Sequence, residues 1–129
     1  MPSYKTKQVD EHGKPIEVVT VGDARPSAQT DALLDATRQA LVNAVTHGGE
    51  PVSLYCEASD TMVEVFVRDH GEGFDMDAIP PDRLGIRESI TGRIKRRGGT
   101  VEIVSRAGWG TEVRMHMPIA LKAAQGEHR

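Results

Sequence analysis

Aromatic residues are scarce in this chain of 129 residues, where Phe, Trp and Tyr together make up 4%. Proteins that bind single-stranded nucleic acid stack bases on aromatic side chains, so this scarcity argues against such a function. A basic surplus is also missing, because 19 acidic residues outnumber 16 Lys and Arg and give a net charge of -3. Nucleic-acid-binding proteins usually carry the opposite balance. We therefore expect no nucleic-acid partner.

The chain also lacks a second cysteine and any long apolar run. The single Cys56 excludes an internal disulfide framework and fits a reducing compartment. Cys56 falls within an alternating strand pattern, where we interpret it as a small core hydrophobe. A transmembrane helix needs about 20 apolar residues, and the N-terminus has no signal-peptide core. We expect a cytoplasmic location and no membrane contact by this domain.

Residues 15–118 have the patterning of one folded domain, long enough for a core of its own. Residues 1–14 are polar, with charges of both signs, and we expect them to form a loosely ordered leader. Residues 119–129 follow Pro118, and we expect them to form a flexible tail.

Apolar residues recur at helical spacing in two parts of the domain. The first predicted helix runs from residue 30 or 31 to 47, and the second from 85 to 97. The pairs Gly48-Gly49 and Gly98-Gly99 are expected to end these helices, because glycine readily takes a positive φ. Leu34, Leu41 and Val45 are predicted to form the apolar stripe of the first helix, and Leu33, Ala36, Ala40 and Ala44 are predicted to widen it.

Strict alternation of apolar and polar residues predicts strands over 52–57, 63–68, 100–105 and 111–117, and a β-branched run predicts another over 16–21. Residues 71–84 hold two glycines and the pair Pro80-Pro81, and they predict a loop. This order of elements predicts an α+β fold, a two-layer sandwich with helices on one face of a mixed, largely antiparallel sheet. No Rossmann or P-loop glycine motif joins a strand to a helix.

The sequence Asp69-His70-Gly71-Glu72-Gly73 lies where one predicted strand ends. A carboxylate there can accept a hydrogen bond from the amino group of a purine, while glycines let the backbone approach the ring. Asn43 and His47 lie four residues apart on one helical face, where they could serve a metal and a phosphate. Together these residues indicate a nucleotide site. The alternatives are a simple Asp-x-Gly turn, a polar core residue and a helix-end histidine.

Four separated segments resemble motifs of the GHKL ATPase superfamily, which includes DNA gyrases, heat-shock chaperones, mismatch-repair ATPases and sensor histidine kinases. Residues 39–47 resemble its N-box, 69–74 its first glycine box, 84–89 its second, and 108–111 its closing glycine-threonine element. The resemblance is nearest to the catalytic ATP-binding domain of a bacterial sensor histidine kinase. It implies the Bergerat ATP-binding fold, with ATP and Mg²⁺ as ligands.

The resemblance also implies roles for particular residues. Asn43 would hold Mg²⁺ through its side-chain oxygen, and His47 would contact phosphate. Asp69 would read the amino group of adenine, while Gly71 and Gly73 would let the backbone lie against the nucleotide.

In the second glycine box the implied nucleotide-binding residues are Gly85, Ile86 and Arg87. We expect Gly85 to open the second helix, whose free amides would face the phosphates. Thr111 would place a hydroxyl near the base. The basic residues at the end of the second helix are explained by its dipole without any ligand: Arg93, Lys95, Arg96 and Arg97.

Two positions depart from the family pattern. Gln39 stands where a glutamate is usual, and an amide cannot act as a base. Thr46 stands where a lysine or arginine is common. We expect ATP binding to survive and phosphoryl transfer to be weakened, and Gln39 is the one candidate catalytic position.

The resemblance predicts a domain that holds Mg²⁺-ATP under a lid at 72–84 and donates the γ-phosphate to a histidine. That histidine would lie on a dimerisation hairpin not present in this chain, and it would serve a response regulator. The location would be cytoplasmic, either free or as part of a membrane-bound sensor, and the isolated domain would be monomeric. The alternatives are a single-domain anti-sigma-factor serine kinase and a nucleotide-binding module without transfer activity.

Overall fold

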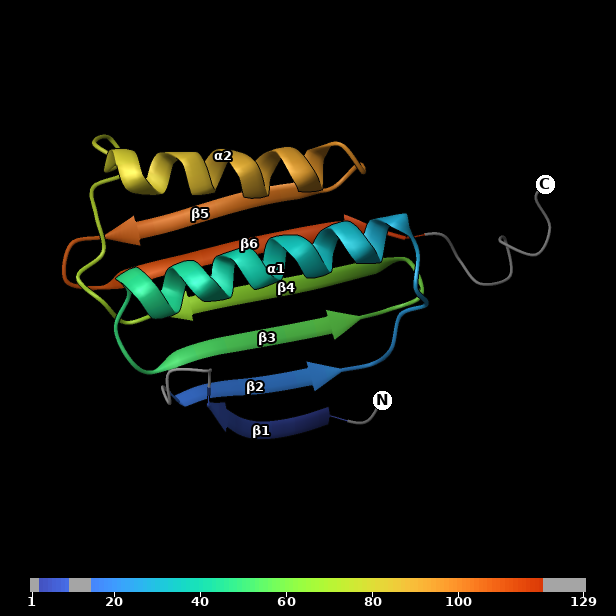
Figure 1. Cartoon of the computed structure of the whole chain (residues 1–129). Coiled ribbons are helices and arrows are strands. Elements are labelled where there is room, and N and C mark those ends of the chain that lie inside the picture. The colour runs from blue at the N-terminus through green and yellow to red at the C-terminus, as the bar shows by residue number, and fades with distance from the viewer. Residues whose placement is uncertain (1–2, 10–14, 120–129) are drawn as a thin grey trace.

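The computed structural model describes residues 3–9 and 15–119. They form two helices over one sheet (Figure 1). The helices are α1 (Ala28–His47) and α2 (Pro81–Lys95). The strands are β1 (Ser3–Val9), β2 (Pro15–Val21), β3 (Val52–Ala58), β4 (Met62–Asp69), β5 (Thr100–Arg106) and β6 (Gly110–Pro118).

The six strands lie in the order β1-β2-β3-β4-β6-β5. Only β2 and β3 pair in parallel, while the other neighbours pair antiparallel. Both helices cover the same face (Figure 1), with α1 over β4 and β6 and α2 over β5. The predicted α+β fold with a mixed, largely antiparallel sheet is confirmed. Neither helix in the described ranges is long and apolar enough to span a membrane.

The core lies between the helices and the sheet. Each central strand sends every second side chain into it, as alternation predicts. On α1 the buried stripe runs through Leu33, Ala36, Ala40 and Ala44. Leu34, predicted for this stripe, is instead 60% exposed. The face of α1 that carries the small alanines packs close to the sheet, and Leu34 lies beside that face. Leu34 lines an apolar groove of about 380 Å³ with Leu54 and Cys56.

Helix α1 begins at Ala28, two residues before the earlier of the predicted starts. Its N-cap is Ser27, whose Oγ accepts a hydrogen bond from the Thr30 amide at 3.1 Å. The Ser27 amide donates to Thr30 Oγ1 at 2.7 Å in return. This reciprocal capping box satisfies two amides that a helix start leaves unpaired, and it therefore fixes where α1 begins.

The predicted start of the second helix at Gly85 is wrong, because α2 begins at Pro81. Proline suits the first position of a helix, where its fixed φ fits and its missing amide costs nothing. The amides of Arg83 and Leu84 both donate to the Pro80 carbonyl, at 2.9 and 3.0 Å. The loop between β4 and α2 is therefore shorter than the lid expected over 72–84.

The leader expected to be loosely ordered includes a strand, since Ser3–Val9 forms β1 and pairs with β2 from Ser3↔Val21 to Val9↔Pro15. An edge strand pairs on one side only and tolerates charged residues. The polar composition of β1 therefore gave no strand pattern in the sequence. Residues 1–2 and 10–14 of the leader and residues 120–129 of the expected tail lie outside the described residues. Ile119 is described, and its amide donates to the Thr61 carbonyl at 2.9 Å.

Candidate functional site

Asp69 ends β4 at an inward-facing position and is only 5% exposed. Its cross-strand partner in β6 is Thr111. One carboxylate oxygen, Oδ1, accepts a hydrogen bond from the Gly71 amide at 2.9 Å. The Asp-x-Gly turn is therefore present. Gly71 is the one hydrogen-bond donor to this carboxylate among the described residues, and it uses Oδ1. The other oxygen, Oδ2, is therefore left for a ligand.

Ser105 of β5 joins three segments next to Asp69. Its Oγ accepts a hydrogen bond from the Phe74 amide at 2.9 Å and donates to the Gly110 carbonyl at 3.0 Å. It also lies 2.8 Å from Thr111 Oγ1, and both hydroxyl residues are buried. The network fixes Thr111 beside Asp69. Sequence reasoning missed Ser105, although a lone polar residue at an inward position after Val101 and Ile103 was a usable signal.

The glycine pair at the end of α1 contacts the first glycine box directly. A Cβ on Gly49 would lie 2.9 Å from the Gly71 Cα, and one on Gly71 would lie 2.7 Å from the Gly49 amide nitrogen. A Cβ on Gly48 would overlap the Asp69 carboxylate carbon. The expected positive φ is wrong for this pair, since Gly48 has φ -97 and Gly49 is not among the positive-φ glycines. Close backbone packing is the reason for glycine here.

Two further glycines of the motifs do require a positive φ. Gly73 has φ +69, and its Cα packs against the Arg106 carbonyl. Gly110 has φ +109 and packs against the Asp69 carbonyl. These residues hold the loop after β4 against the β5–β6 turn, so the glycine boxes have a packing role that exists without nucleotide.

Asn43 and His47 lie on the last two turns of α1, both half-buried. The side-chain oxygen of Asn43, Oδ1, is buried and has no hydrogen-bond partner among the described residues. Such an acceptor is costly when unpaired and suits a hard cation. The His47 carbonyl accepts a hydrogen bond from Arg83 Nη2 at 3.3 Å. Asn43 therefore fits Mg²⁺ chemically.

One protein oxygen is sufficient for such a site, because Mg²⁺ keeps several waters and shares phosphate oxygens. No group of three or more His, Cys, Asp or Glu within residues 3–9 and 15–119 could hold a metal. A cation at Asn43 would therefore take its other ligands from a nucleotide and from water.

Gln39 connects the two helices. Its Nε2 donates to Ser89 Oγ at 3.2 Å, and Ser89 Oγ lies 3.3 Å from Gln39 Oε1, to which it can donate. Gln39 lies on α1 one turn before Asn43, on the same face. The side chain of Gln39, the candidate catalytic residue, is thus hydrogen-bonded to Ser89 of α2. Sequence reasoning did not identify Ser89 as its partner.

Gly85 lies in the second turn of α2 and is exposed, with open space where a Cβ would be. The sequence predicts that Gly85 opens the helix with a free amide facing the phosphates. Its amide lies instead in the helix interior, so it is not one of the free amides of the helix start. Ile86 is half-buried against the core, and Arg87 is half-buried. Arg83 of α2 contacts the end of α1 through a hydrogen bond from its Nη2 to the His47 carbonyl, and sequence reasoning missed this residue.

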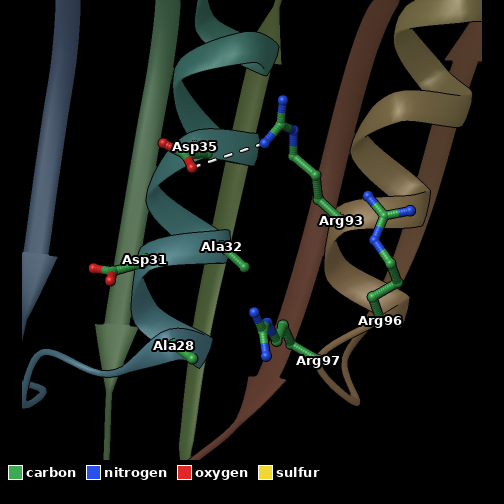
Figure 2. Close-up of a pocket in the computed structure, with 7 residues that line it drawn as sticks. All are labelled: Ala28, Asp31, Ala32, Asp35, Arg93, Arg96 and Arg97. Atoms are coloured by element: carbon green, nitrogen blue, oxygen red, sulfur yellow. Dashed lines mark ion pairs between the residues drawn. The ribbon is translucent and has the colours of Figure 1, made fainter.

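A separate groove of about 590 Å³ lies between the start of α1 and the end of α2 (Figure 2). Arg93 and Arg97 extend toward α1, and Arg93 lies 3.8 Å from Asp35. The small Ala28 and Ala32 line the α1 side. Asp35 is the α1 residue of the groove nearest to Asn43 in sequence, and eight residues at 1.5 Å each separate the two by about 12 Å along the helix. The groove is therefore distinct from the candidate nucleotide site.

A sequence profile of the histidine kinase-, DNA gyrase B- and HSP90-like ATPases matches residues 28–121. The sensor histidine kinase LiaS of Bacillus subtilis (strain 168) is 29% identical over 90 residues, which are 69% of this chain and 25% of LiaS. The chain thus spans about a quarter of that relative.

Two structures of the blue-light activated histidine kinase of Erythrobacter litoralis EL346 share the fold. Its histidine kinase domain gives a TM-score of 0.58 at 21% identity, over 77% of this chain and 52% of that chain. A second structure gives 0.61 at 21% identity, over 84% of this chain and 37% of that chain.

The profile match covers both helices and the strands that carry every candidate residue. It confirms the resemblance stated from the four motifs, and the structural likeness confirms the fold of histidine kinase ATP-binding domains. The chain therefore belongs to the family of histidine kinase-, DNA gyrase B- and HSP90-like ATPases, and it carries an ATPase domain of the histidine kinase type.

Proposed function

We propose that this domain binds Mg²⁺-ATP where β4 and α1 end, and that it transfers the γ-phosphate to a histidine on a partner hairpin. The observation that carries the proposal is the buried carboxylate of Asp69, which lies beside Thr111 and has one oxygen engaged by the Gly71 amide. The remaining oxygen of this carboxylate can accept a further hydrogen bond, and the exocyclic amine of adenine is a suitable donor.

The hydrogen-bond network also favours adenine over guanine. A carbonyl can only accept, so the single proton of Ser105 Oγ goes to the Gly110 carbonyl. Thr111 Oγ1 must then donate its own proton to Ser105, at 2.8 Å. Thr111 and Asp69 are therefore both acceptors toward a ligand. The 6-amino group of adenine matches them, whereas the 6-oxo group of guanine would place acceptor against acceptor.

Asn43 is the residue that would hold Mg²⁺, through its otherwise unpaired Oδ1. The bound cation would neutralise phosphate charge. From the set that the family implies, we propose that His47 of α1 and Arg87 of α2 contact phosphate. Ile86, which precedes Arg87 on α2, and the glycines Gly71, Gly73 and Gly85 would border the nucleotide.

Transfer would depend mainly on positioning and charge neutralisation. Gln39 can orient a nucleophile but cannot accept its proton, because its amide is no base. We propose that the accepting histidine lies on a helical hairpin outside the given sequence and that a response regulator takes the phosphoryl group next. The domain alone is expected to be monomeric.

Isothermal titration calorimetry of the purified domain tests the nucleotide proposal. We expect heat on titration with ATP and Mg²⁺, weaker binding in EDTA, and binding to GTP weaker by about 100-fold, because a mismatched polar pair costs a few kcal/mol. Equal affinities for ATP and GTP would contradict the roles of Asp69 and Thr111. Absence of binding to the folded domain at millimolar ATP would refute the proposal.

A nucleotide-binding module without transfer is a second candidate, favoured by the amide at Gln39 and its hydrogen bonds to Ser89. Incubation of the domain with γ-labelled ATP and an isolated dimerisation hairpin separates the two. Label on the hairpin histidine supports the kinase. ATP binding without label, beside a kinase that labels the same hairpin, supports the module.

A further inference from the structure

Two buried side-chain atoms near the end of α1 lack hydrogen-bond partners among the described residues. One is an acceptor, Asn43 Oδ1, and the other is a donor, Arg83 Nε. Arg83 is joined to α1 through His47, whose carbonyl accepts from Nη2 at 3.3 Å. His47 lies one turn after Asn43 on the same helical face. An unpaired acceptor on α1 and an unpaired donor on α2 thus both belong to residues near the C-terminal end of α1.

Arg83 comes from the first turn of α2, where the pair Pro80-Pro81 sets the helix start. Its guanidinium lies 5.5 Å from the centre of the Phe74 ring, near the outer limit of a cation–π contact. The half-buried side chain therefore contacts the end of α1 on one side and the loop after β4 on the other. These contacts hold the guanidinium in place without using Nε.

A third unpaired atom shows why this arrangement is unusual. Arg68 Nε is also buried without a hydrogen bond, but its guanidinium lies 3.9 Å from the centre of the Trp109 ring. Trp is the best aromatic partner for a cation, and this distance is close. Arg68 therefore has electrostatic compensation from an aromatic ring. Arg83 has only the Phe74 ring, at a longer distance. An anion is therefore the fitting partner for its unpaired Nε.

We propose that Arg83 contacts a phosphate of the bound nucleotide through Nε, opposite the cation held by Asn43. The inference rests on the proposed ATP site and adds a residue to it. A metal-bound polyphosphate is the ligand class that satisfies both unpaired atoms, because it brings a cation to the amide oxygen and an anionic oxygen to the guanidinium.

Helix α2 would then bind phosphate through a side chain near its start. Pro81 has no amide hydrogen, and the amides of Arg83 and Leu84 donate to the Pro80 carbonyl, so we assign the phosphate contact to the Arg83 side chain and not to these backbone amides. Phosphate binding by Arg83 would add a link between α1, the nucleotide and the Phe74 loop. The loop position would then respond to the phosphates and not to the base.

Calorimetric titration of the whole chain with ATP and with adenosine tests this assignment. Replacing Arg83 by Ala should weaken ATP binding by about 10- to 100-fold, the range for a lost hydrogen bond to a charged group. Adenosine binding should stay within about twofold, because the base contacts at Asp69 remain. Arg83→Lys should be intermediate, since it keeps the charge without the planar fork.

Arg96→Ala is the matched control, because Arg96 is an arginine at the C-terminal end of α2, lines the separate groove, and should leave ATP affinity unchanged. Arg83→Gln is a second variant that keeps a donor for the His47 carbonyl, in case the alanine variant folds poorly.

Equal losses for ATP and adenosine would show that Arg83 only supports the fold, and unchanged ATP binding would show that it contacts no phosphate. Either result overturns the assignment while the proposed function stands. A wild-type domain that binds no ATP would overturn both.

Discussion

Gly48 at the end of α1 packs directly against the carboxylate of Asp69 at the end of β4. A Cβ on Gly48 would lie 2.5 Å from the Asp69 Cβ and would overlap its carboxylate carbon. No real Cβ contact is that short. The helix end and the strand end are thus fitted to each other before any ligand binds.

Gly48→Ala is therefore expected to destabilise the domain by about 1–3 kcal/mol, the usual cost of overpacking, and to displace Asp69. Urea denaturation followed by far-ultraviolet circular dichroism measures the loss. Gly85→Ala is the matched control, because open space surrounds it in the interior of α2. It should stabilise the apo domain by about 0.5–1 kcal/mol. A neutral Gly48→Ala would refute the packing argument.

Asp69→Asn should weaken ATP binding by about 10- to 100-fold, because it removes the charge that strengthens the hydrogen bond to the amine. The Asn oxygen can still accept from the Gly71 amide, so the turn should survive. Asp75→Asn is the control, since Asp75 Oδ1 accepts from the Asp77 amide at the same 2.9 Å in an exposed turn. Equal effects of the two substitutions on ATP affinity would count against a base-reading role.

Ser105→Ala should destabilise the domain by about 1–3 kcal/mol, because it leaves the Phe74 amide and Thr111 Oγ1 buried without this partner. Thr111 would then be free to turn its proton toward a ligand, so the preference for ATP over GTP should shrink. Denaturation and paired titrations with the two nucleotides measure both effects. A stable variant with unchanged preference would show that Ser105 does not orient Thr111.

Gln39→Glu should leave ATP affinity unchanged and raise turnover, because a carboxylate can accept the proton that an amide cannot. Ser89 Oγ can still donate to the new side chain, as it can to Gln39 Oε1. Steady-state ATP hydrolysis and transfer to a hairpin substrate are the measurements, with Gln39→Ala as the variant that has neither group. Equal or lower turnover for Gln39→Glu would argue against a base at this position.

Burial raises the pKa of the Cys56 thiol above its ordinary value of 9.0. The native thiol should therefore be alkylated more slowly than that of the urea-unfolded chain, with a pH profile displaced to higher pH. The unfolded chain loses this proton first, so the free energy of unfolding should fall as pH rises past the unfolded pKa. Identical native and unfolded alkylation profiles would contradict the prediction.

Strand and helix content was largely predictable, because alternation and 3.6-residue periodicity are local signals. Predictions failed where tertiary contacts decided the outcome. The start of α2 depended on Pro81 and not on Gly85, and Leu34 turned outward because the alanine stripe packs more closely on the sheet. Polar β1 was missed because an edge strand requires backbone pairing and not an apolar face.

The sequence by itself determined the family and the chemical types in the candidate site, since Asp69, Asn43 and the glycines follow from motif order and spacing. Only the tertiary structure decided how those groups are partnered. It set Gly48 against Asp69, Ser105 against Thr111, and Arg83 against the end of α1. The physical reason is that unpaired donors, unpaired acceptors and close backbone contacts arise between segments far apart in the chain, and periodicity carries no information about them.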